Sequence, residues 1–195
     1  MLTHQSRTQS RTVPSITDEF AYSSDTSGSE TFTYRWPLCD YGHRVELPLP
    51  TRAFPPKMLN DGTFVVEPRD NRRKGLGIEV ISVSGQLIYQ PPLAKHETVP
   101  TFPPIRSSQS GDRIAVNVLT VHGGNEWLDI GWHVTSRRVA VYDIAARKEV
   151  VSVLAGLHYR YHFEYDLSPD GHHLAILEDD TVRIIELDQY EKGKR

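Results

Sequence analysis

A short polar turn placed just before an apolar strand occurs three times in this 195-residue sequence. Each copy carries a glycine among Asp, Asn or Ser residues. Glycine adopts positive φ at no steric cost, and Asp or Asn side chains bond the nearby backbone, so each copy predicts a tight hairpin between two strands. The copies span residues 59–66, 108–116 and 167–176.

Each turn is followed, after a loop, by a second predicted strand, and the first two copies continue into a further strand. The second strands are predicted over 78–83, 138–144 and 181–187, and the further strands over 85–89 and 148–153. The turn glycines Gly62, Gly111 and Gly171 lie 49 and 60 residues apart. A four-stranded antiparallel unit therefore repeats along the chain, which predicts an all-β repeat protein.

Two motifs give this repeat a family resemblance. Ser168-Pro-Asp-Gly171, followed by Leu174-Ala-Ile176, and the run Val139-Ala-Val-Tyr-Asp-Ile144 resemble the WD40-like and YVTN-type β-propeller repeats. The resemblance covers about residues 58–188 and implies four-stranded blades. It is good in the last pair of repeats and degenerate in the first, and the turns at Gly62 and Gly111 lack the proline.

The predicted organisation is a propeller of about three to four blades. The approximate units are 31–55, 56–100, 101–155 and 156–190, after a disordered or loosely attached segment over 1–30 and before a charged tail over 191–195.

The first unit holds a predicted hairpin, 31–36 with 43–47, and the last unit lacks a fourth strand. Either strand of that hairpin could supply it, as happens where a propeller closes. A truncated or half-length propeller is the leading interpretation. A small closed propeller, or closure by self-association, is the alternative.

Composition narrows the possible partners. A formal net charge of −3 disfavours general binding to nucleic acid or anionic membranes, and no apolar run approaches the roughly 20 residues that cross a bilayer. Cys39 is the only cysteine and cannot form a disulfide within the chain. A secretory signal is not recognisable, so the default location is the cytoplasm.

The first candidate contact site is a basic loop over 69–75. Arg72, Arg73 and Lys74 could bind a phosphate, a carboxylate or an acidic segment of a partner. The alternative is an ordinary solvated connection between strands.

The second candidate is the long loop over 122–133. Trp127, Trp132 and His133 are candidate contacts because tryptophans often anchor protein interfaces. Alternatively, the two indoles cap the hydrophobic layers of the propeller.

No cofactor or metal is expected. His158 and His162 are spaced to share one face, but no third ligand follows at a recognisable spacing. The function predicted is a non-catalytic platform for a protein or peptide partner. The alternative is a propeller enzyme, or part of one, of hydrolase, lactonase or quinone-dependent dehydrogenase type, whose site is assembled from several blades.

Overall fold

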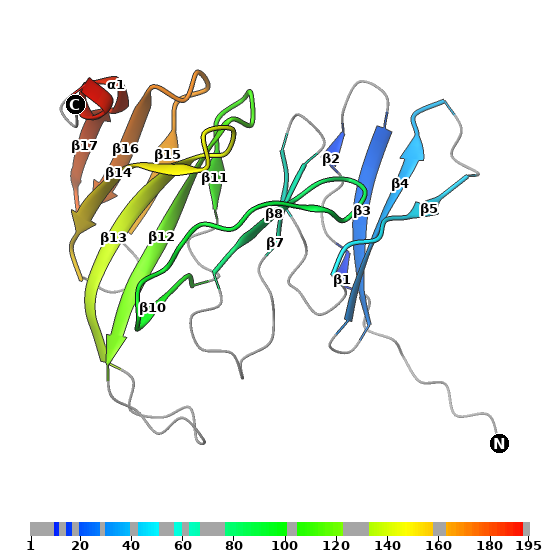
Figure 1. Ribbon diagram of the computed structural model, residues 1–195, viewed down its shortest axis with the longest axis horizontal. Coiled ribbons are helices and arrows are strands. Elements are labelled where there is room, and N and C mark those ends of the chain that lie inside the picture. The colour runs from blue at the N-terminus through cyan, green and yellow to red at the C-terminus, as the bar shows by residue number, and fades with distance from the viewer. Residues whose placement is uncertain are drawn as a thin grey trace.

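The described residues form four antiparallel sheets that stand side by side in chain order, as this computed structural model shows (Figure 1). The structure describes residues 10–11, 15–16, 20–27, 30–39, 43–50, 57–59, 63–66, 77–100, 105–122, 133–157 and 163–192. In this part of the chain, no helix is long and apolar enough to cross a membrane.

The first sheet contains the predicted hairpin and three further strands from its N-terminal side. Its strands are β1 (Ser10–Arg11), β2 (Ser15–Ile16), β3 (Phe20–Ser27), β4 (Glu30–Pro37) and β5 (Val45–Glu46). β4 pairs with β5, with Tyr34 opposite Glu46, so the hairpin is confirmed.

The loose attachment expected over 1–30 does not hold for β3, which pairs with β4 along its whole length. The Ser24 and Thr33 hydroxyls, both buried, bond each other at 3.0 Å. Cross-strand polar pairs therefore replace the apolar residues whose scarcity suggested disorder.

The second sheet is short and the third is long. The second comprises β6 (Lys57–Met58), β7 (Phe64–Val66), β8 (Glu79–Ile81) and β9 (Leu87–Tyr89). The third comprises β10 (Glu97–Thr98), β11 (Arg106–Ser107), β12 (Arg113–His122), β13 (His133–Asp143) and β14 (Lys148–Ala155). β10 and β11 both pair with β12, so the first strand of the third sheet is split in two.

The fourth sheet has three strands, as the sequence predicted, and ends in a helix that it did not predict. Its elements are β15 (Phe163–Leu167), β16 (His173–Glu178), β17 (Thr181–Glu186) and α1 (Leu187–Lys192). Completion of this sheet by 31–36 or 43–47 is wrong, because β4 and β5 belong to the first sheet.

The turn chemistry behaves as expected where the structure describes it. Gly111 and Gly171 have φ of 82° and 73°, and Asp170 accepts a hydrogen bond from the backbone of His172. Gly62 lies outside the described residues.

Three hydrophobic clusters hold neighbouring sheets together, one at each junction. Alternation along a strand sends successive side chains to opposite junctions. In β12, Val116 packs against the second sheet and Ala115 against the fourth. In β7, Val65 packs against the third sheet while Phe64 packs against the first. The middle sheets are consequently buried on both faces, which explains their nearly continuous apolar strands.

Candidate functional site at the end of the third sheet

β12 and β13 form the longest ribbon among the described residues, with 10 and 11 residues. Pairing runs from Arg113 opposite Asp143 to His122 opposite His133. The ribbon extends past the short strands of the second sheet (Figure 1). His122, His133 and Val134 are exposed at its far end. The ribbon thus presents exposed side chains past the strands of the second sheet.

A third segment supports this end of the ribbon. Glu97 and Thr98 of β10 pair with Thr120 and Leu119, and the Val121 amide donates to the His96 carbonyl at 2.9 Å. The hydroxyls of Thr120 and Ser136 lie 3.1 Å apart across the ribbon. The projecting part is therefore three strands wide.

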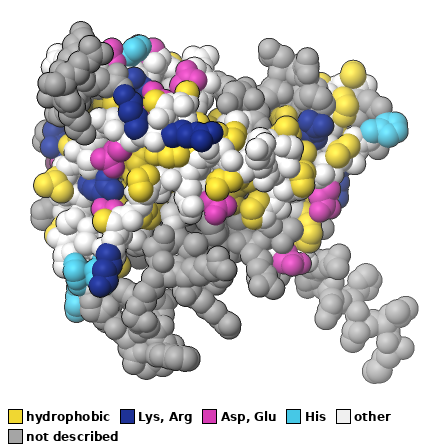
Figure 2. All heavy atoms as spheres, in the orientation of Figure 1, with side chains coloured by type: hydrophobic (Ala, Val, Ile, Leu, Met, Phe, Trp, Pro, Cys, Tyr) yellow, Lys and Arg dark blue, Asp and Glu magenta, His cyan; other side chains and the backbone are white. Residues whose placement is uncertain are grey.

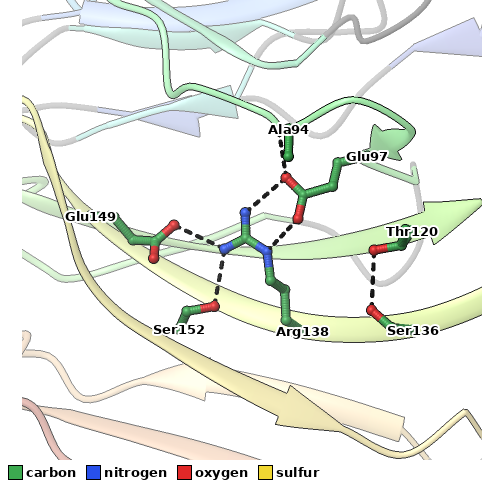
Figure 3. A network of polar contacts seen from close by, with 7 residues as sticks. All are labelled: Ala94, Glu97, Thr120, Ser136, Arg138, Glu149 and Ser152. Carbon is green, nitrogen blue, oxygen red and sulfur yellow. Dashed lines mark hydrogen bonds and ion pairs between the residues drawn. The ribbon is translucent and has the colours of Figure 1, made fainter.

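Arg138 of β13 anchors the ribbon through a network of charged hydrogen bonds (Figure 3). Its guanidinium makes a two-pronged contact with Glu97, at 2.8 Å and 3.1 Å, and donates to Glu149 at 2.8 Å and to the Ser152 hydroxyl at 3.0 Å. The Ala94 amide also donates to Glu97. Arg138 and Glu97 are both mostly buried, so the network ties β10, β13 and β14 together in a partly dry environment.

The network keeps both partners charged. The hydrogen bond from Arg138 lowers the pKa of Glu97, against the opposing effect of burial. Burial alone would lower the pKa of Arg138, but hydrogen bonds to Glu97 and Glu149 outweigh it and the pKa is raised. An ion pair that stays charged makes a fixed base for the ribbon.

Histidines gather at the tip of the ribbon. The His96 and His122 rings lie 4.9 Å apart, and His133 is the strand partner of His122. Figure 2 shows histidine side chains grouped near the ends of β12 and β13, with a Lys or Arg beside them. Among the described residues, no group of three or more His, Cys, Asp or Glu side chains is arranged to hold a metal ion.

The structure describes only part of the sites predicted from sequence. His133 is exposed and opens β13. Arg72, Arg73, Lys74, Trp127 and Trp132 lie outside the described residues, as do His158 and His162.

Sequence reasoning missed Glu97, Arg138 and Glu149. The available signal was Arg138 itself, a charged residue directly before the buried run that begins at Val139.

A second polar group joins the first strands of consecutive sheets. The Lys57 ammonium donates to the Ile105 carbonyl at 2.7 Å, and Arg106 donates to the Tyr165 carbonyl at 3.2 Å while pairing with Glu164 at 3.5 Å. Burial, followed by the nearby charge of Arg106, lowers the pKa of Lys57 to about 8. Lys57 therefore loses its proton closer to physiological pH than an ordinary lysine does.

Comparison with known proteins supports the fold. The sequence matches no protein-family profile and no curated protein. Among solved structures, Hsv2 of Kluyveromyces lactis is similar with a TM-score of 0.54 and 16% identity, covering 93% of this chain and 50% of that one.

Two enzymes give matches of the same quality. An oligogalacturonate lyase from Vibrio parahaemolyticus has a TM-score of 0.55 at 9% identity, covering 86% of this chain and 48% of its own. The acylaminoacyl peptidase of Pyrococcus horikoshii has a TM-score of 0.56 at 11% identity, covering 91% and 32%.

These structures are β-propellers, so the predicted fold class is confirmed: the chain consists of β-propeller-like antiparallel sheets. The chain spans about half the length of the first of these structures. At such low identity the similarity concerns the fold alone.

Proposed function

We propose that this protein is a non-catalytic, WD40-like propeller module that binds a protein or peptide partner. The observation that carries the proposal is the anchored ribbon of the third sheet. Its base is fixed by the Arg138 network, and its tip exposes His122, His133 and Val134. A rigid support with exposed imidazole and apolar groups suits peptide recognition, because little conformational freedom of the support is lost on binding.

The same ribbon carries the loop in which the sequence places Trp127 and Trp132. Tryptophan is enriched among the residues that dominate interface energies. We therefore expect the partner to contact the tip and this loop together. The basic run Arg72 to Lys74 is the second predicted contact.

The test is selection of peptides from a random phage-displayed library on the immobilised wild-type chain. Selected peptides should bind at least tenfold more weakly to the Val134→Glu and His133→Ala variants. Leu154→Glu is the control, because Leu154 is an exposed apolar residue of the same sheet that lies on β14, away from the tip. Equal binding to all three variants would place the contact elsewhere, and Trp127→Ala, Trp132→Ala and Arg73→Ala would then locate it.

A second candidate function is catalysis. The observation that favours it is the lowered pKa of Lys57 at the junction between sheets. An amine with a pKa of about 8 at the junction of first strands is a residue type that can act as a base or nucleophile. Several blades contribute to this junction, as propeller sites require. Turnover in an esterase and lactonase screen, abolished in Lys57→Met, would favour the enzyme. Activity that survives this substitution would exclude Lys57 from it.

A further inference from the structure

The fourth sheet, β15 to β17, repeats the turn geometry and strand register of β11 to β13 in the third sheet. The turns at Gly111 and Gly171 have the same positive φ, and equivalent amides, those of Ile144 and Leu187, close the two units at 2.9 Å and 2.8 Å. In both sheets the strand after the turn pairs in the same register with the next strand. Val139 and Val141 of β13 therefore correspond to Val182 and Ile184 of β17.

The equivalent residues differ sharply in burial. Val139 and Val141 are 0% exposed because the fourth sheet covers them, whereas Val182 is 60% and Ile184 is 69% exposed. Their strand partners are Leu177 and Ala175 of β16, so the four side chains share one face. We call Ala175, Leu177, Val182 and Ile184 the outer apolar face. The outer apolar face therefore resembles in composition the face of the third sheet that packs against the fourth.

At the opposite end of the molecule, the first sheet has a face that no other described sheet covers. Tyr22 packs against the second sheet, with its ring centroid 5.7 Å from that of Phe64. The strand partners Ser24 and Thr33 lie on the same face of the first sheet as Tyr22 and are both buried. The alternate residues of β4 therefore point away from the second sheet. These are Phe32, Tyr34 and Trp36, all only partly buried, and the exposed Arg44 guanidinium lies over the Tyr34 ring at 3.5 Å. We call them the first-sheet aromatic face.

We propose that a second copy of this chain docks on the outer apolar face through its own first-sheet aromatic face. A two-fold rotation produces this contact twice, so that two copies close one ring and neither face stays open. The size of related folds agrees with this occupant. The chain aligns over 93% of its length with only 50% of Hsv2, so two copies supply about as many sheets as one such propeller. Apolar patches of this kind on soluble proteins mark interaction sites.

The first experiment is the solution mass by light scattering after size exclusion. The wild-type chain should give twice its 22.2 kDa mass, and Ile184→Glu should give the single-chain mass. Leu154→Glu is the matched control and should stay dimeric, because Leu154 is 71% exposed but lies on β14 outside the outer apolar face. A monomeric wild type, a trimer or open polymer, or a dimer that survives Ile184→Glu would overturn the proposal.

A mixing experiment tests which faces meet. Ile184→Glu and Trp36→Glu chains should each be monomeric alone. Mixed one to one they should recover the dimer, because one of the two contacts in the mixed ring is then wild type on both sides. A dimer built from two outer apolar faces would tolerate Trp36→Glu and would show no recovery on mixing. Recovery requires folded chains, so it shows that each single variant had lost docking and had kept its fold. Mixing without recovery refutes the ring.

Discussion

The third and fourth sheets share one sequence pattern but differ in what surrounds them. In the third sheet, alternating apolar residues are buried on both faces because sheets stand on either side. In the fourth, the equivalent outward residues are exposed. The polar contacts differ in the same way, since Arg138 binds within a mostly buried network and Arg183 of β17 pairs with Glu178 at the surface. Local sequence sets the strand and its register, and neighbouring sheets decide how much each residue contributes to stability.

The largest expected effect is the loss of Arg138. Arg138→Ala leaves Glu97 buried and uncompensated, so the free energy of unfolding should fall by about 3 to 5 kcal/mol. Arg183→Ala, the control in the fourth sheet, should cost at most about 1 kcal/mol because its ion pair is exposed. Urea unfolding followed by tryptophan fluorescence measures both. Similar losses would mean that the two sheets are equally enclosed.

A smaller difference is expected between equivalent apolar residues. Val141→Ala removes buried methyl groups and should cost about 2 kcal/mol, whereas Ile184→Ala in the monomer should cost less than about 0.5 kcal/mol. The comparison requires protein dilute enough that the unfolding midpoint no longer depends on concentration. If Ile184→Ala is as costly under these conditions, then another part of the same chain covers the outer apolar face.

A third change should stabilise the protein. Asn117 of β12 is 1% exposed, and neither its side-chain oxygen nor its nitrogen has a hydrogen-bond partner among the described residues. Its equivalent in β16 is Leu177, whose side chain has the same branched shape. Asn117→Leu should therefore raise the free energy of unfolding by about 1 kcal/mol, and the reciprocal Leu177→Asn should cost about 0.5 kcal/mol or less. Destabilisation by Asn117→Leu would show that the amide binds a polar group at this junction.

The sequence was sufficient to predict the repeats, because turn chemistry and apolar alternation are local signals. Gly111 and Gly171 adopt positive φ as their turns require, and the strands after them are present. The hairpin of β4 and β5 is confirmed for the same reason. β3 was missed because its buried Ser24 is satisfied by Thr33, a partner that only the paired structure identifies.

The candidate site was less predictable than the fold. Glu97 and Arg138 are 41 positions apart and meet only because β10 returns alongside β12. Nothing in the spacing of these residues indicates their contact. His133 was singled out from sequence, but its neighbours His122 and His96 were not grouped with it as contacts, since that grouping depends on strand register.

The smallest expected effect concerns an exposed contact in the fourth sheet. His172 lies 2.9 Å from Asp188 at the start of α1, and the hydrogen bond to this carboxylate raises the pKa of His172. A raised pKa stabilises the folded state fully below the ordinary histidine value of about 6.5, and the contribution disappears as pH rises through the folded-state value. In an NMR titration, the pKa of His172 should lie above 6.5 in the wild type and return toward it in Asp188→Asn. The unfolding midpoint should accordingly fall slightly between pH 6 and pH 8 in the wild type and change less in the variant. An unchanged titration in Asp188→Asn would mean that water screens this pair completely, which would make the contrast with the Arg138 network still larger.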